Sequence, residues 1–176
     1  MKLAKRPASG AMAPEEFFGF TVSSIGYGVS RRFQQVLAPL GLEPREFALL
    51  RGVGADEGAS QQTISERYQI PASRMVAFVD GLEQRGLMER RMNPRDRRTR
   101  ALHLTPSGRK LLARALVVAE ELERELTADL TASERRTLVE TLHRVGRTLG
   151  VTPGTHAAGG ADWSDAVDTS KRAARK

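Results

Sequence analysis

The residues best suited to chemistry lie in one stretch, NPRDRRTRALHLTPSGRKLL, at positions 93–112. Six of its first eighteen residues are basic, and the sequence then takes on the character of a helix start. From residue 85 to residue 100, seven arginines stand against Glu89 and Asp96, a net charge of +5. Arginines this dense on a short loop repel one another, so the cluster indicates an anionic surface opposite it. A solvated basic face also explains a charge run, and charge alone does not choose between the two.

The composition of the chain indicates which class of anionic partner the arginine cluster would bind. The chain has 176 residues, enough for one domain, and carries a formal net charge of +7. A basic excess gathered in one segment favours nucleic acid as the partner. The aromatic residues are six Phe, two Tyr and one Trp, too few to suggest recognition through rows of stacked bases.

Several other kinds of chemistry are excluded or disfavoured. The absence of cysteine removes disulfides, thiolate metal sites and thiol-oxidation sensing. The histidines, His103, His143 and His156, have no metal-ligand spacing, and no nucleophile–base–acid arrangement is visible. We therefore expect no enzyme activity, no metal and no cofactor. Without a long apolar run or an apolar signal segment, we expect a cytoplasmic protein that does not contact membranes.

The N-terminal half predicts three helices. The first, over about 14–37, has apolar residues at helical spacing, namely Phe18, Val22, Ile25, Val29, Phe33, Val36 and Leu40. Pro44 suits the first turn of a second helix, whose inner face would carry Phe47, Leu50 and Val53. Ser60 is a suitable N-cap for a short third helix, with Ile64 and Tyr68 facing inward.

A fourth helix is predicted within PASRMVAFVDGLEQRG, residues 71–86, because Pro71 lies near its start and Gly86 just past its end. Its buried stripe would consist of Met75, Val79 and Leu82. The opposite side is small and polar where a solvated helix would carry Glu and Lys, and it consists of Ser73, Arg74, Ala77 and Gly81. Such a face suits a helix that must fit into a groove.

A hairpin and two long helices complete the predicted elements. Residues 87–92 and 99–104 have the pattern of strands joined through Asn93-Pro94. Thr105-Pro106 predicts the start of a fifth helix, and the capping box TASE at 131–134 predicts a sixth. Only a partner can bury the long apolar stripes of these helices, which are Leu112, Leu116, Ala119, Leu122, Leu126 and Leu130, then Leu138, Leu142, Val145 and Leu149.

This order predicts a mainly α fold with a small β-hairpin wing, a winged helix-turn-helix. In such a unit one helix enters the major groove of DNA and the hairpin reaches a neighbouring groove. The expected divisions are a flexible arm over 1–13, the domain over 14–150 and a flexible tail over 151–176. Within the domain, 38–104 would form the DNA-binding lobe, and 14–37 with 105–150 would form dimerisation helices.

Residues 70–112 resemble the core of the MarR family of bacterial transcription regulators. The matching motifs, at the family's spacing, are V-D-x-L-E-x-x-G-L-x-x-R over 79–90, D-R-R over 96–98 and L-T-x-x-G over 104–108. With the helix order, the resemblance covers about 14–150, and it implies a homodimer whose first, fifth and sixth helices interlock. The chain departs from the family at Glu43 and Pro71, where smaller polar capping residues are common.

The resemblance places the recognition helix over 72–84. Arg74 is the residue best able to bond a guanine edge, and Ala77 offers an apolar contact to a thymine methyl. A phosphate contact is the alternative for Arg74. The residues expected at the bases are Ala72, Ser73, Arg74 and Ala77.

In the wing, the resemblance implies that Asp96 holds Arg98 extended into the minor groove. Arg95, Arg97 and Arg100 would then lie on or near phosphates. Further contacts to the DNA backbone, for which a solvated surface role is an equal alternative, are expected at Gln61, Gln62, Arg90 and Arg91.

Family members bind small aromatic acids between the dimer helices and the DNA-binding lobe, which suggests an effector site here. The residues that could line it are Phe20, Ser24, Tyr27, Phe47 and Leu50. Ordinary core or dimer packing is the favoured alternative for these five. A ligand acts only if it favours a dimer whose recognition helices are wrongly spaced for DNA.

The sequence thus predicts a dimeric, ligand-responsive repressor that reads two half-sites of a pseudo-palindrome about 10 base pairs apart. One alternative is a nonspecific nucleoid-type or RNA-binding protein, which would bind scrambled duplexes equally well. Another is an interaction module that keeps the fold but no longer binds DNA.

Overall fold

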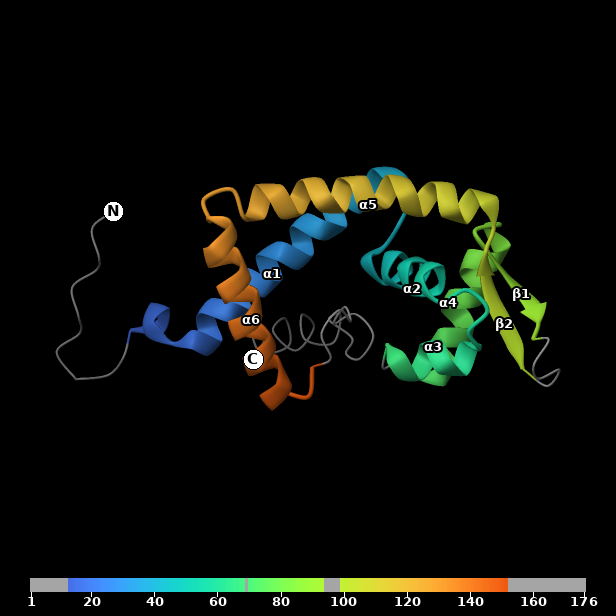
Figure 1. Cartoon of the computed structure of the whole chain (residues 1–176), viewed down its shortest axis with the longest axis horizontal. Helices are drawn as coiled ribbons and strands as arrows, with labels where there is room; N and C mark the ends of the chain where they lie inside the picture. The colour runs from blue at the N-terminus through green and yellow to red at the C-terminus, as the bar shows by residue number, and fades with distance from the viewer. Residues whose placement is uncertain (1–12, 69, 94–98, 152–176) are drawn as a thin grey trace, which may run out of the picture.

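The structure, a computed structural model, describes residues 13–68, 70–93 and 99–151. It is mainly helical with one antiparallel hairpin, in the order that the sequence predicts. The elements are η1 (Pro14–Glu16), α1 (Phe18–Leu37), η2 (Ala38–Leu40), α2 (Pro44–Ala55), α3 (Gln61–Arg67), α4 (Ala72–Gln84), β1 (Met88–Met92), β2 (Arg100–Leu104), α5 (Pro106–Leu126) and α6 (Ala132–Thr148). In Figure 1, α5 runs along one edge, with α2, α3, α4 and the hairpin at one end and α6 at the other.

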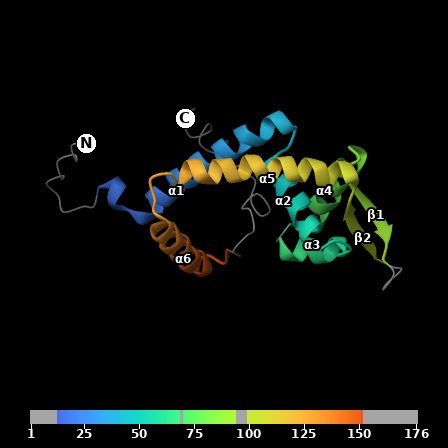
Figure 2. The same ribbon diagram turned by 45° about the horizontal axis from the view of Figure 1, so that its top comes forward.

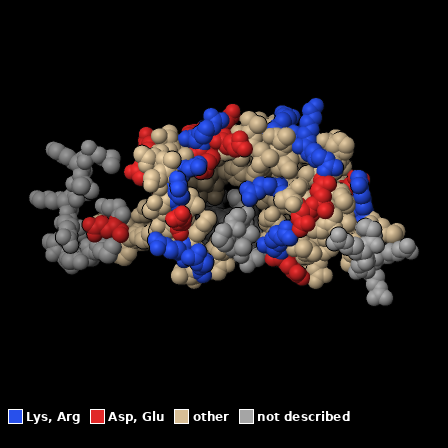
Figure 3. All heavy atoms as spheres, viewed as in Figure 1, with Lys and Arg blue, Asp and Glu red and all other residues tan. Residues whose placement is uncertain are grey.

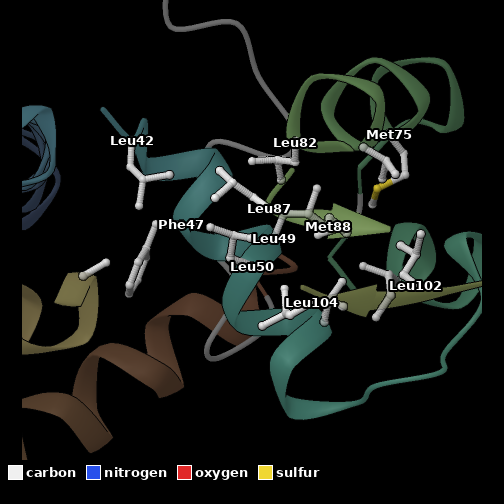
Figure 4. Close-up of a cluster of buried hydrophobic side chains, with 14 of the residues drawn as sticks. Leu42, Phe47, Leu49, Leu50, Met75, Leu82, Leu87, Met88, Leu102 and Leu104 are labelled. Carbon is white, nitrogen blue, oxygen red and sulfur yellow. The ribbon is translucent and has the colours of Figure 1, made fainter. Parts of the chain in front are cut away.

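The lobe formed by α2, α3, α4 and the hairpin holds most of the hydrophobic core, to which α1 adds Leu37 and α5 adds Ala115. Its fully buried side chains come from every one of these elements, and Figure 4 shows many of them converging between α2, α4 and the two strands. They include Leu49, Leu50, Val53, Ile64, Met75, Val79, Leu82, Met88, Leu102 and Leu104. The predicted inner faces of α2 and α4 are thereby confirmed, and burial of these apolar surfaces holds the elements of the lobe together.

The hairpin is a regular ladder that continues into the loop before α3. Met88 pairs with Leu104 and Met92 with Arg100, so the two strands are in register along their whole length. The Leu102 N–H donates to the Ala59 carbonyl at 3.0 Å, and Ser60 forms a bridge with Ala101. Ala101 is therefore buried, although the alternation of β2 places it opposite the core residues Leu102 and Leu104.

The start of α5 explains the L-T-x-x-G motif. The Thr105 hydroxyl donates to the Gly86 carbonyl at 2.6 Å and accepts from the Gly108 N–H at 3.0 Å, which caps the helix. The Thr105 N–H donates to the Leu87 carbonyl at 3.2 Å. A Cβ at position 108 would overlap that carbonyl, so only glycine allows α5 to approach the turn that ends α4.

α1 begins later than the sequence predicts, at Phe18 rather than Pro14, because Pro14–Glu16 forms a separate 3-10 turn. Its predicted apolar stripe divides into two parts. Val29, Phe33 and Val36 are half-buried against the rest of the chain, whereas Phe18, Val22 and Ile25 are exposed. An ion pair of 3.0 Å between Arg32 and Glu125 joins α1 to α5, and Figure 2 shows the two helices crossing at an angle.

α6 buries none of its residues in the single chain. Thr131 and Glu134 form the predicted capping box, with the Thr131 N–H donating to the Glu134 carboxylate at 2.8 Å. These bonds, the one from the Thr131 hydroxyl first, lower the pKa of Glu134. The apolar stripe of the helix is nevertheless exposed at Leu138, Leu142 and Leu149. No helix in the described part of the chain could cross a lipid bilayer.

Replacing Gly108 by Ala tests the close approach of α5 to Leu87. We expect Gly108→Ala to lower the free energy of unfolding by about 1–3 kcal/mol, because the backbone must shift to admit the methyl group. Urea denaturation followed by circular dichroism measures the change. The control is Gly81→Ala in α4, where an added Cβ meets open space and should add roughly 0.5–1 kcal/mol through helix propensity. Equal stability of the two variants would contradict the assignment.

Candidate nucleic-acid interface

The outer face of α4 is the most distinctive feature of the lobe. Its inner face is fixed in the core by Met75, Val79 and Leu82, as predicted. Ala72, Ser73 and Ala77 are exposed on the outside, and Arg74 is half-buried. These small side chains leave the helix backbone accessible, which a helix needs if it is to enter a groove.

Val76 lies on the same outer face, and sequence reasoning missed it. Its side chain is 45% exposed, although valine is ordinarily buried. The position is three residues after Ser73, so helical spacing alone could have placed it on this face. An exposed methyl pair at a DNA-facing position can contact the methyl group of thymine.

Two contacts fix α4 against α2. The Arg85 guanidinium donates to the Glu46 carboxylate at 2.9 Å and to the Gly41 carbonyl at 2.7 Å. The Arg45 guanidinium lies 5.4 Å from the centre of the Phe78 ring, within the range of a cation–π contact. Glu46 also accepts from the Glu43 N–H at 2.9 Å, which offsets the poor capping residue at the start of α2.

Arg90 and Gln61, both expected at the DNA backbone, contact each other. The Arg90 Nε donates to the Gln61 Oε1 at 3.2 Å. Its other guanidinium nitrogens form ion pairs with Asp80 at 2.6 Å and Glu83 at 2.5 Å. Arg90 therefore joins α3, α4 and β1, and its role at the backbone stays a prediction that must account for these carboxylates.

The remaining backbone candidates lie on the surface of the lobe. Gln62 is exposed and donates to the Glu66 carboxylate at 2.9 Å. Arg91 is exposed and pairs with Glu89 on its own strand. Arg100 is exposed at the start of β2, next to the loop that Asn93 closes by donating to the Thr99 hydroxyl at 3.2 Å. The wing residues Arg95, Asp96, Arg97 and Arg98 lie outside the described residues.

Basic side chains also gather on the half of α5 nearest the hairpin (Figure 3). Arg109, Lys110 and Arg114 are exposed there. Arg109 and His103 approach Glu57, which neutralises part of this charge at the base of the hairpin. Among the described residues, no group of His, Cys, Asp or Glu is arranged to hold a metal ion.

The five residues predicted to line an effector site do not come together in the single chain. Phe47 and Leu50 belong to the lobe core, and the Phe47 ring packs edge-on against Phe33 with 5.4 Å between centroids. Phe20 precedes Phe33 by thirteen residues on α1, roughly 20 Å along the helix, and is exposed. Phe47 and Leu50 thus fit the core-packing alternative, whereas Phe20, Ser24 and Tyr27 are exposed to a ligand or a partner chain.

Comparison with known proteins matches residues 40–99 to the family described as the MarR family. A protein of Thauera aromatica, described as a transcriptional regulatory protein for the hcr operon, is 31% identical over 82% of this chain and 86% of its own. The transcriptional repressor CouR bound to a 23-mer DNA duplex is 34% identical, with a TM-score of 0.70 over 75% of this chain and 94% of that one. CouR from Rhodococcus jostii RHA1 bound to p-coumaroyl-CoA is 26% identical, with a TM-score of 0.69 over 77% and 95%.

Arg74 is half-buried at the edge of the outer face of α4, and the sequence leaves a base contact and a phosphate contact open for it. We expect Arg74→Ala to relax discrimination at one base position of each half-site by roughly tenfold, the scale of a lost bidentate contact. Competition binding with duplexes substituted at single positions measures this. A uniform loss of affinity on every duplex, with the salt slope reduced by about one, would make Arg74 a phosphate contact instead.

Proposed function

Because this chain belongs to the MarR family of winged helix-turn-helix transcriptional regulators, we propose that it is a dimeric repressor released by an aromatic acyl-CoA thioester. It is a sequence-specific DNA-binding regulator and not an enzyme. The observation that carries the proposal is the outer face of α4, small and accessible, next to a hairpin whose loop is rich in arginine.

The outer face of α4 and the wing supply complementary contributions to operator binding. Ser73, Arg74, Val76 and Ala77 present a hydroxyl, a guanidinium and methyl groups to base edges. The wing arginines contribute electrostatic attraction to the phosphates, which depends little on the DNA sequence. Since phosphate contacts position a protein and base contacts specify its site, this division favours an operator over general nucleic-acid binding.

A second copy of the chain is the proposed cover for the exposed apolar surface. α6 has no buried residue, and the N-terminal half of α1 exposes Phe18, Phe20 and Ile25. A monomer rarely leaves extensive apolar surface in water. A two-fold dimer would pair two α4 helices with the half-sites of a pseudo-palindromic operator, and occupancy of that operator would block transcription.

The effector class rests on the comparisons. A similar protein is described as bound to p-coumaroyl-CoA, and that protein and this chain share their fold over about three quarters of this chain. Such a ligand would release DNA only by binding more tightly to a dimer whose α4 helices are wrongly spaced. Phe20, Ser24 and Tyr27 are the residues of this chain that we propose for the aromatic part of the ligand.

Fluorescence anisotropy tests this function directly. The full chain is titrated into duplex DNA from upstream of its own gene and into a scrambled duplex, at physiological salt. We expect at least a thousandfold preference for the first duplex, the lower end for specific binders. We also expect release by p-coumaroyl-CoA but not by p-coumarate or coenzyme A alone. Equal binding to both duplexes would favour the nonspecific alternative, and release by p-coumarate alone would overturn the thioester assignment.

Replacing Leu142 on α6 tests the dimer. Leu142→Asp places a carboxylate in the exposed apolar stripe, and burying it unpaired should raise the dimer dissociation constant by at least about a hundredfold. Sedimentation velocity at micromolar concentration should show a dimer for the wild type and a monomer for this variant. Thr137→Asp, which adds the same charge away from the stripe of the same helix, is the control and should remain dimeric. A monomeric wild type would contradict the dimer outright.

A further inference from the structure

Arg90, at the third position of β1, joins the elements that we propose to contact DNA. Its guanidinium reaches Asp80 and Glu83 on α4 and Gln61 on α3. The Arg90 N–H also donates to the Glu83 carboxylate at 3.0 Å, so Glu83 holds both the backbone and the side chain of Arg90. We refer to Arg90, Asp80, Glu83 and Gln61 as the Arg90 cluster.

We propose that Arg90 is a positioning residue, which sets the angle between α4 and the wing and does not itself bind phosphate. The inference rests on the proposed function and adds a residue that acts on sequence discrimination. It also replaces the simpler expectation that Arg90 contacts the DNA backbone.

The bonding of Arg90 supports the proposal because each of its side-chain nitrogens already has a partner. Nε donates to Gln61, Nη1 to Glu83 and Nη2 lies 2.6 Å from Asp80. The side chain is only 20% exposed, in contrast to 55% for its neighbour Arg91. A phosphate would have to compete with carboxylates that already hold the guanidinium through short, charge-assisted bonds partly shielded from water.

The charge of the Arg90 cluster also argues against a phosphate contact by Arg90. Two carboxylates surround one guanidinium, so the Arg90 cluster has a formal charge of −1 and offers no net attraction to a phosphate. Asp80 lies one helical turn after Val76 and Ala77, at the end of the outer face of α4. Without Arg90, this carboxylate would stand unpaired beside DNA and repel it.

Geometry explains why an arginine is needed at this position. The planar guanidinium presents donors in a rigid fork, which lets one side chain bond three partners on two helices at once. A lysine carries the same charge on a flexible stem but cannot hold these partners in fixed relative positions. The substitution Arg90→Lys therefore separates positioning from charge.

The experiment measures operator and scrambled-duplex binding of the full chain at several salt concentrations. For Arg90→Lys we expect roughly tenfold weaker operator binding, the factor for loss of one charge-assisted hydrogen bond, with little change on the scrambled duplex. The dependence of log Kd on log salt should stay the same. The control is Arg67→Lys, which alters an arginine–carboxylate pair with Asp56 elsewhere in the lobe and should bind as the wild type does.

A phosphate contact predicts a different pattern. Arg90→Lys would then bind like the wild type, while Arg90→Gln would weaken both duplexes equally and reduce the salt slope by about one. That pattern would overturn the positioning role while leaving the proposed function intact. A wild type that does not discriminate between the duplexes would instead overturn the function and this inference together.

A double-mutant cycle provides a second measurement, of the coupling between Arg90 and Asp80. Asp80→Asn removes a carboxylate partner, and its direct effect on DNA cancels in the cycle. If Arg90 acts through Asp80, Arg90→Lys should cost clearly less affinity in the Asp80→Asn background than alone. Additive losses would overturn the proposal. Asp80→Asn with Glu83→Gln, which leaves Arg90 in place, should likewise lower discrimination if the cluster sets the angle of α4.

Discussion

The contact between the start of α5 and the turn that ends α4 is the constraint on which the rest of the molecule depends. Thr105 bonds the Gly86 carbonyl and caps α5, while the missing side chain at Gly108 lets the helix meet Leu87 directly. The end of α4 is thereby attached to the start of α5. A movement of the start of α5 would act on the end of α4 through the bonds from Thr105 to Gly86 and Leu87.

On one side of this contact the apolar side chains are buried within the single chain, and on the other side many of them are exposed. The core of the lobe is closed by side chains from its three helices and the hairpin, together with Leu37 of α1 and Ala115 of α5. The α1 and α6 end leaves its apolar stripes in water, although the Arg32–Glu125 and Arg135–Glu123 pairs already tie both helices to α5. In the proposed function, the lobe would recognise DNA and the α1 and α6 end would associate with another copy of the chain.

Sequence patterns predicted the elements well because local rules determine them. Pro71, Gly86 and the apolar spacing between them indicate both ends of α4 to within a residue or so, and Thr131 with Glu134 sets the start of α6. Such signals act within a few residues and need no knowledge of the rest of the chain.

The site was harder to predict because it depends on which residues meet in space. Arg90 stood out as one of many arginines, and only the fold shows that Asp80 and Glu83 occupy its guanidinium. Phe20 and Phe47 looked like neighbours in a shared cleft, but the length of α1 separates them. Val76 was overlooked because valine usually marks a core.

Because α5 is long, a small tilt at one of its ends produces a large displacement at the other. Its 21 residues form a rod of roughly 30 Å. One end is joined to α6 through a short turn, and the other end contacts the end of α4. A tilt of only about 10° at the α6 end would displace the other end by about 5 Å, roughly one and a half base pairs. In the proposed function, a ligand that separates the helices at the α6 end would therefore shift α4 relative to its half-site without contacting any base.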